Sequence, residues 1–219
     1  MELRDYQVEA IKNARAELAS GKKRVLIVAP TGSGKTVVAA AIIRSAVEKG
    51  KRIVFLAHRK ELITQTSEKL HAFGVRHGII KAGFAAAPQH SVQVASVQTL
   101  ARRAGAAVDA DLVFIDEAHH VTSANTYQKL LDRWPRARAI GLTATPWRLD
   151  GRGLSDLFDA HVLSTTPWAL RDQGWLVPVG GWIYEATDSD GANIPPGMPD
   201  IIARNVAASF SMKLVTSVL

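Results

Sequence analysis

Short apolar runs alternate along the chain with longer segments whose apolar residues recur at helical spacing. The runs at 25–28, 52–57, 111–115 and 139–142 are nearly continuous apolar stretches of strand length. Strands that are buried on both faces have this pattern, and strands that alternate with helices form a mostly parallel sheet. We therefore expect an α/β fold, a three-layer domain with a mostly parallel central sheet.

The remaining elements are predicted from spacing and from end signals. The first helix begins at Asp5, which can cap it, and ends at Gly21. We expect a second helix that begins after residue 36 and ends at about residue 49, and further helices at 60–73, 125–134 and 168–173. Short strands are expected at 77–81 and 92–95. The pattern changes after about residue 163, so we predict a domain at 1–165 and an extension at 166–219. Within the extension we expect an extended segment at 176–184, turns at 188–197 and an amphipathic helix at 201–219.

Residues 29–36, between the first strand and the second helix, have the sequence Ala-Pro-Thr-Gly-Ser-Gly-Lys-Thr. A strand, a glycine-rich turn, Gly-Lys-Thr and a helix form a phosphate-binding loop (P-loop), in which backbone N–H groups and the helix N-terminus face a phosphate. Lys35 can reach the β- and γ-phosphates of a nucleotide, and the Thr36 hydroxyl can ligate Mg²⁺. The residues expected to bind the nucleotide here are Thr31, Gly32, Ser33, Gly34, Lys35 and Thr36. Ala29 stands where the general motif has glycine.

Two acidic residues follow the strand that ends at residue 115. Asp116 is suited to hold Mg²⁺, usually through water, and Glu117 to orient or deprotonate the attacking water. Two acids in this position could also begin a polar loop or cap a helix. The P-loop upstream in the same domain favours the catalytic interpretation, in which Lys35, Asp116 and Glu117 act on a nucleoside triphosphate.

Composition limits the classes of protein that remain. The 219 residues suffice for one well-buried domain plus an extension, and the absence of cysteine excludes disulfides and thiolate metal sites. No set of His, Asp and Glu has structural-zinc spacing, so the metal we expect is Mg²⁺ brought with a nucleotide. Lys and Arg exceed Asp and Glu by 27 − 20 = 7, which favours a polyanionic partner such as nucleic acid but equally fits a basic solvated surface. No apolar run approaches a membrane span, so we predict a cytoplasmic protein without membrane contact.

Asp-Glu-Ala-His at 116–119 resembles a motif of superfamily 2 helicases and translocases of the DEAH/DExH kind, in their N-terminal RecA-like motor domain. Further segments that resemble motifs of this family follow in the expected order at 3–7, 56–62, 95–100 and 142–146. With the P-loop, the resemblance covers roughly residues 3–165. The Thr-Ala-Thr-Pro-Trp-Arg sequence that starts at Thr143 is similar to DNA-directed members, such as bacterial RadD-like and restriction-type translocases.

The resemblance implies roles for residues that chemistry alone would not single out. It implies adenine recognition by Gln7, coupling of ATP hydrolysis to movement through His119, Thr143 and Thr145, and nucleic-acid contacts by Arg59, Gln98 and Thr99. Taken alone, Gln7 would be an exposed helix residue, Arg59 part of a solvated basic cluster, Gln98 and Thr99 a satisfied loop pair, and His119 a hydrogen-bonded core residue. We expect His120 at the surface.

Members of this family close two RecA-like domains around ATP, and the second domain supplies arginines to the transferred phosphoryl group. Residues 166–219 are too few for such a domain. We therefore expect an ATP-binding motor domain of a nucleic-acid-dependent ATPase, a helicase or translocase with DNA favoured over RNA. A second RecA-like domain or a partner protein would be needed for full activity. Two alternatives are a P-loop ATPase that does not act on nucleic acid and a truncated, non-hydrolysing module that binds nucleic acid or a partner.

Overall fold

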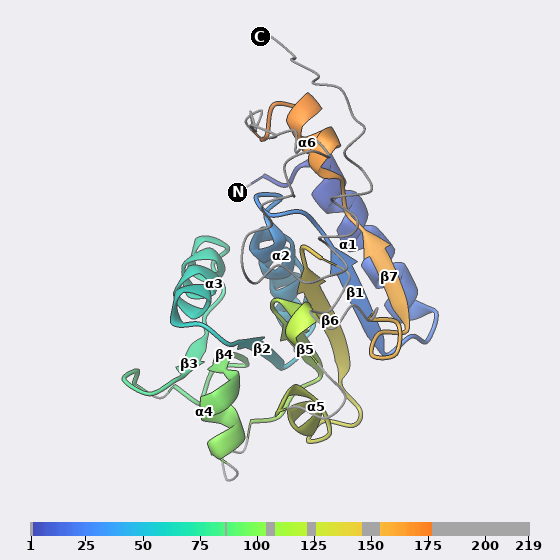
Figure 1. The fold of residues 1–219 in the computed structure, drawn as a ribbon. Coiled ribbons are helices and arrows are strands. Elements are labelled where there is room, and N and C mark those ends of the chain that lie inside the picture. The colour runs from blue at the N-terminus through green and yellow to red at the C-terminus, as the bar shows by residue number, and fades with distance from the viewer. Residues whose placement is uncertain (1, 86, 104–107, 122–125, 146–153, 177–219) are drawn as a thin grey trace, which may run out of the picture. The chain divides into compact units, whose positions relative to one another are not determined.

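The computed structural model describes residues 2–85, 87–103, 108–121, 126–145 and 154–176 (Figure 1). The chain divides into two units, Met1–Val177 and Pro178–Leu219. The turns predicted at 188–197, the helix predicted at 201–219 and most of the extended segment predicted from residue 176 therefore lie outside the described residues. The domain boundary at residue 165 stays a prediction.

Seven strands of the described chain form one sheet, in which every pairing is parallel. They are β1 (Arg24–Val28), β2 (Ile53–Ala57), β3 (Gly78–Ile80), β4 (Val92–Ser96), β5 (Leu112–Ile115), β6 (Arg138–Thr143) and β7 (Ala160–Leu163). Their order across the sheet is β3-β4-β2-β5-β6-β1-β7. The strands predicted from apolar runs are all present. β7, at one edge, was not predicted because Val162 is its single buried residue.

Helices cover both faces of this sheet (Figure 1). They are α1 (Asp5–Ala19), α2 (Lys35–Glu48), α3 (Lys60–Ala72), α4 (Val97–Arg102), the 3₁₀ turn η1 (Ala118–His120), α5 (Thr126–Leu131) and α6 (Pro167–Asp172). One apolar core joins α1, α2 and α3 to the sheet, and a second joins α4, η1 and α5 to it. In β1, Val25 and Ile27 face the first core and Leu26 the second. The predicted three-layer α/β architecture is therefore confirmed.

Two helix predictions need correction, and one helix was not predicted. Asp5 does not cap α1, because Arg4 occupies the cap position, where its N–H donates to Oε1 of Gln7 at 3.0 Å. The helix predicted at 125–134 ends at Leu131, since the chain tightens into a shorter turn ahead of Pro135. α4 was not predicted as a helix, and its first turn is capped by the Ser96 hydroxyl.

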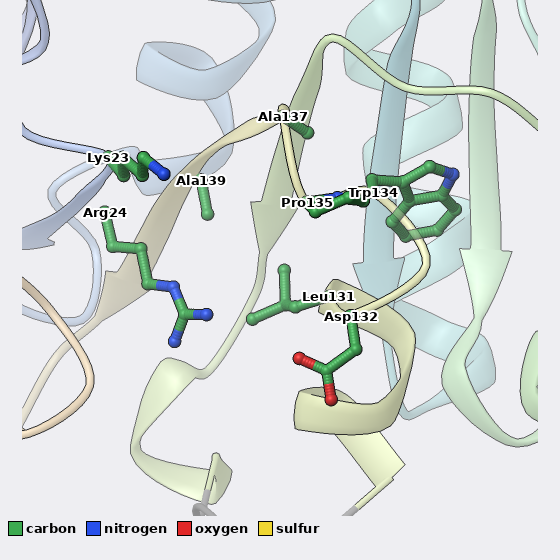
Figure 2. Close-up of a pocket in the computed structure, with 8 residues that line it drawn as sticks. All are labelled: Lys23, Arg24, Leu131, Asp132, Trp134, Pro135, Ala137 and Ala139. Carbon is green, nitrogen blue, oxygen red and sulfur yellow. The ribbon is translucent and has the colours of Figure 1, made fainter.

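A pocket and two hydrogen bonds lie at the edge of the sheet where the strands begin. A pocket of about 260 Å³ lies there, lined by Lys23, Arg24, Leu131, Asp132, Trp134, Pro135, Ala137 and Ala139 (Figure 2). Nearby, the Asp159 carboxylate accepts hydrogen bonds from the backbone N–H groups of Lys23 at 2.8 Å and Arg24 at 2.9 Å. These bonds join the start of β1 to the start of β7. The pocket is at the opposite end of β1 from the P-loop, so it is no part of a nucleotide site.

We expect Asp159→Ala to lower the free energy of unfolding by about 1 kcal/mol at pH 7, because two backbone donors lose a charged acceptor. The N–H of Arg24, with that of Lys23, lowers the pKa of the Asp159 carboxyl below its usual value. The ionised Asp159 carboxylate therefore contributes to stability above the pKa of about 4 that an aspartate has in the unfolded chain. This contribution is lost as the pH falls through the lower pKa of Asp159 in the folded protein. Urea unfolding of both proteins at several pH values measures this difference.

Asp172→Ala is the control, since Asp172 is an exposed acid that pairs with its neighbour Arg171. It should change stability little at any pH. An Asp159→Ala effect that is equally large at pH 2 and pH 7 would contradict the proposed bonds to the carboxylate.

Candidate nucleotide-binding and hydrolysis site

The parallel sheet brings the motifs together at one edge, because the carboxyl ends of parallel strands lie on the same side. The P-loop follows β1, Asp116 follows β5, and Thr143 ends β6, which lies between these two strands. The N–H of Ala29 donates to the carbonyl of Thr143 at 2.9 Å, and that of Asp116 to the carbonyl of Leu56 at 3.0 Å. Residues far apart in the chain are thus adjacent through backbone hydrogen bonds.

The P-loop folds back on itself before α2 begins at Lys35. Gly34, at the cap position, has a φ of 82°, in the left-handed region that favours glycine. Ser33 is buried, and its hydroxyl donates to the carbonyl of Pro30 at 2.6 Å. Nζ of Lys35 donates to the carbonyl of Ala29 at 3.3 Å. Thr31 and Gly32 are exposed and Thr36 is half-buried. Of the six residues predicted to bind a nucleotide, Thr31 to Gly34 lie in the loop, and Lys35 and Thr36 begin α2.

Two side chains of α1 hold this loop at Ser33. The Tyr6 hydroxyl and Nε2 of Gln7 both donate to the Ser33 carbonyl, each at 2.9 Å. Gln7 is only 3% exposed, and its Oε1 accepts the N–H of Arg4. A Cβ added to Gly34 would lie 2.6 Å from Nε2 of Gln7. Gln7 therefore contacts the P-loop directly, while its predicted role in adenine recognition stays a prediction.

The segment after α6 reaches the same loop. The guanidinium of Arg4 lies 3.7 Å from the ring centroid of Trp175 and donates to the Tyr6 hydroxyl at 2.8 Å. A Cβ added to Gly32 would lie 2.9 Å from Cδ2 of Leu176. Tyr6 and Trp175 were not among the predicted site residues. Tyr6 stands next to Gln7 in its motif, which was an available signal, whereas nothing in the sequence around Trp175 indicated this contact.

The two acids at the end of β5 have different environments. Asp116 is 4% exposed, and burial, then the charge of Glu117, raises its pKa to about 6. The N–H of Glu117 donates to Oδ1 of Asp116 at 3.0 Å, and the charge of Lys35 opposes the shift. Glu117 has a φ of 50° and is the one non-glycine residue of the described chain in the left-handed region. Such strain, about 1–2 kcal/mol, is concentrated at functional sites.

His119 joins these acids to β6. Its Nδ1 lies 3.1 Å from Oγ1 of Thr143 and 3.3 Å from Oε2 of Glu117. The Thr143 hydroxyl already donates to the carbonyl of Thr145 at 2.7 Å, so Nδ1 carries the hydrogen and donates it to the Thr143 hydroxyl. Burial, followed by the charge of His120, lowers the pKa of His119. The structure thus brings together His119, Thr143 and Thr145, the residues predicted to couple hydrolysis to movement.

Tyr127 was also missed by sequence reasoning. It is buried in α5, and its pKa is raised by burial and by the nearby charges of Asp116 and Glu117. A tyrosine in a short helix has no chemical signature that would distinguish it from an ordinary core residue. The charges of the two acids act on its hydroxyl, which places Tyr127 close to them.

The residues predicted to contact nucleic acid lie farther along the same edge. Arg59 is exposed after β2, at the cap position of α3. Gln98 is exposed and Thr99 is half-buried in the first turn of α4, after β4. The Ser96 hydroxyl donates to Oε1 of Gln98 at 3.0 Å and accepts the N–H of Thr99 at 3.5 Å. Arg59 and Gln98 therefore present side chains to solvent beside the nucleotide motifs.

His120 differs from its prediction as a surface residue. It is half-buried, and its ring packs against those of His119 and His58. The described residues contain no group of three or more His, Cys, Asp or Glu that could hold a metal ion. Across the same part of the chain, no helix is both long enough and apolar enough to cross a membrane.

The family was determined by comparison with known proteins. Residues 1–148 match the ResIII family model, described as "Type III restriction enzyme, res subunit". The chain belongs to the ResIII family. The predicted resemblance to the N-terminal RecA-like domain of superfamily 2 helicases is thereby confirmed, whereas assignment to the DEAH-box group stays a prediction.

Individual relatives of this chain are longer than it is. It is 33% identical over 192 residues to the putative ATP-dependent helicase IRC3 of Saccharomyces cerevisiae, covering 80% of this chain and 28% of that protein. It is 35% identical over 154 residues to the DNA 3′-5′ translocase XPB2 of Sulfurisphaera tokodaii, covering 69% of this chain and 33% of that protein. The chain thus spans about a third or less of these relatives.

The UvsW helicase of bacteriophage T4 has a similar fold. Its structure aligns with a TM-score of 0.63 at 17% identity, over 74% of this chain and 60% of that one. At this identity the likeness shows the fold alone. It agrees with the all-parallel sheet and confirms the predicted RecA-like class.

We expect Gly34→Ala to weaken Mg²⁺-dependent binding of an ATP analogue at least about tenfold, because the added Cβ displaces Gln7 and the loop that Gln7 holds. Gly74→Ala is the matched control: Gly74 also has a positive φ, 71°, but a Cβ there meets nothing within 4 Å. Both variants should lose about 1 kcal/mol of stability from backbone strain. Calorimetric titration with Mg·ATPγS and urea unfolding separate the two effects; equal affinities in both variants would contradict the prediction.

Proposed function

We propose that this domain binds Mg·ATP and is the N-terminal motor domain of a nucleic-acid-dependent ATPase, a DNA helicase or translocase. One observation carries the proposal. The P-loop lysine, the buried Asp116 and the strained Glu117 converge at one sheet edge, where His119 links them to Thr143. A site for ATP alone does not need the exposed Arg59 farther along this edge, which favours the helicase type over another P-loop ATPase.

The residues present fit a magnesium nucleotide. Mg²⁺ prefers oxygen ligands, and few of them come from the protein. The Thr36 hydroxyl and the Asp116 carboxylate supply such oxygens. Burial raises the pKa of Asp116 because it penalises an isolated negative charge, and a divalent cation would remove that penalty. When bound, Mg²⁺ neutralises charge that develops on the phosphate oxygens.

The remaining residues bind the phosphates, orient a water molecule and accept its proton. The P-loop N–H groups and Lys35 hold the phosphates. Glu117 orients a water molecule and accepts its proton, and Nδ1 of His119, 3.3 Å from Oε2 of Glu117, lies beside that carboxylate and helps to position it. Tyr6 and Gln7 keep the loop in place through Ser33, and Gln7 remains our candidate for adenine recognition.

We propose that nucleic acid binds along the β2 and β4 end of the same edge, where Arg59, Gln98 and Thr99 would contact its backbone. The net charge of +7 supports a polyanionic partner. The name of the relative XPB2, a DNA translocase, favours DNA over RNA. A cytoplasmic location stays a prediction.

Full activity would require a second RecA-like domain or a partner protein, since the family's phosphoryl-contacting arginines lie in the second domain. The matches cover about a third or less of these relatives, which supports this proposal. We therefore expect the 219-residue chain to bind Mg·ATP tightly and to hydrolyse it slowly. The alternative is that this chain is a binding module that does not hydrolyse ATP at all.

Lys35→Ala should weaken Mg·ATPγS binding at least about tenfold, because the charge that faces the β- and γ-phosphates is removed. Glu117→Gln should bind the analogue as the unaltered chain does but abolish the slow hydrolysis. Lys49→Ala, at the exposed end of the same helix, is the control. Calorimetry gives affinity, and phosphate release with and without single- and double-stranded DNA and RNA gives turnover. Binding that survives Lys35→Ala would exclude the P-loop as the nucleotide site.

Arg59→Ala should weaken binding of single-stranded DNA severalfold and reduce the slope of log affinity against log salt by about 0.7, the value for one lost phosphate contact. Arg44→Ala is the matched control, since Arg44 is an exposed arginine of α2 that pairs with Glu48. Fluorescence anisotropy between 50 and 200 mM salt, about the range in which such slopes are measured, tests both. Equal losses in the two variants would indicate non-specific attraction rather than a contact at Arg59.

A further inference from the structure

The carboxyl edge of the sheet has two functional halves. The ends of β5, β6 and β1 carry the acids, the coupling threonines and the P-loop, whereas the ends of β4 and β2 carry Gln98 and Arg59. The halves meet where β2 pairs with β5, with Leu56 opposite Ile115. Under the proposed function, the two ligands bind on opposite sides of this boundary.

Three histidine rings lie across the boundary. The rings of His119 and His120 have centroids 4.2 Å apart at an interplanar angle of 47°. The His120 ring also meets that of His58 edge to face, with centroids 4.6 Å apart and an angle of 72°. His58 follows β2 directly, while the other two form part of η1 after β5. His120 thus lies between a residue of each half.

Each end of this row is attached to a functional segment. On one side, Nδ1 of His119 contacts Glu117 and Thr143. On the other, His58 precedes Arg59, the cap residue of α3. Nδ1 of His58 is buried and has no hydrogen-bond partner among the described residues. The position of the His58 ring is therefore set largely by packing, and His120 is part of that packing.

The electrostatics agree with close packing of the rings. Burial lowers the pKa of His58, with a further contribution from His120. Burial is likewise the largest cause that lowers the pKa of His119. Both rings are therefore neutral at pH 7, so they can approach a third imidazole without repulsion between charges.

We propose that His120 is a positioning residue that transmits the state of the nucleotide site to the nucleic-acid-binding segment at His58 and Arg59, through its ring contacts with His119 and His58. This inference rests on the proposed function. A change in the contacts of His119 with Glu117 or Thr143 shifts its ring, and the adjoining rings must follow because they are closely packed. The shift ends at Arg59, where α3 begins.

The test measures linkage between two ligands rather than turnover, so slow hydrolysis by the chain does not affect it. The dissociation constant of a fluorescent single-stranded oligonucleotide is measured with and without saturating Mg·ATPγS, and the ratio is the coupling factor. We expect a factor of about 5 or more, in either direction, for the unaltered chain. For His120→Ala we expect a factor within about twofold of one, with the affinity for each ligand alone unchanged.

Two further variants separate transmission from simple loss of structure. His120→Phe keeps a flat ring of similar thickness and should restore most of the coupling factor. His71→Ala removes an exposed histidine of α3 outside the cluster and should leave the factor unchanged. A double-mutant cycle of His58→Ala and His120→Ala should be strongly non-additive, because either change interrupts the same contact. Imidazole NMR signals of His58 should respond to Mg·ATPγS in the unaltered chain and not in His120→Ala.

The outcomes distinguish this inference from the proposed function. If the unaltered chain binds neither Mg·ATPγS nor the oligonucleotide, the proposed function itself is wrong. If it binds both but has a coupling factor of one, or if His120→Ala retains the full factor, the role of His120 is wrong while the proposed function stands. A loss of both individual affinities in His120→Ala, together with a lower unfolding free energy, would show a structural role and would also overturn the inference.

Discussion

Parallel backbone pairing of β1 and β5 on either side of β6 is the constraint on which the site depends. The hydrogen bonds of this pairing place three strand ends at one edge, and the bond from the Ala29 N–H to the Thr143 carbonyl continues it into the P-loop. Apolar cores on both faces hold the sheet in place. A side chain that directly follows one of these strands therefore lies in the site. The backbone pairing of the strands thus largely determines the geometry of the site.

A second constraint acts on the loop itself. One carbonyl, that of Ser33, accepts hydrogen bonds from Tyr6 and Gln7, and the missing side chain of Gly34 leaves room for the Gln7 amide. The segment that carries this tyrosine and glutamine is remote in sequence from the acids at the end of β5, yet it determines the shape of the loop opposite them. The P-loop is therefore supported from two sides, by the sheet and by α1.

The sequence allowed prediction of those parts that depend on local pattern. β2 and β5 are continuous apolar runs buried along their whole length, and the P-loop and Asp116 follow strands directly. What it missed depends on tertiary contacts. β7 has one buried residue, and the contacts of Trp175 with Arg4 and of His120 with His58 join segments distant in sequence. No local periodicity could indicate such pairs.

The place of β6 also sets the width of the site. Neighbouring strands lie about 4.8 Å apart, so β1 and β5 are separated by roughly 10 Å. That gap is comparable with the length of a triphosphate chain together with a metal ion, and no side chain defines it. Substitutions along the edge can therefore change which groups face the gap, but they leave its span unaltered as long as the three strands stay paired.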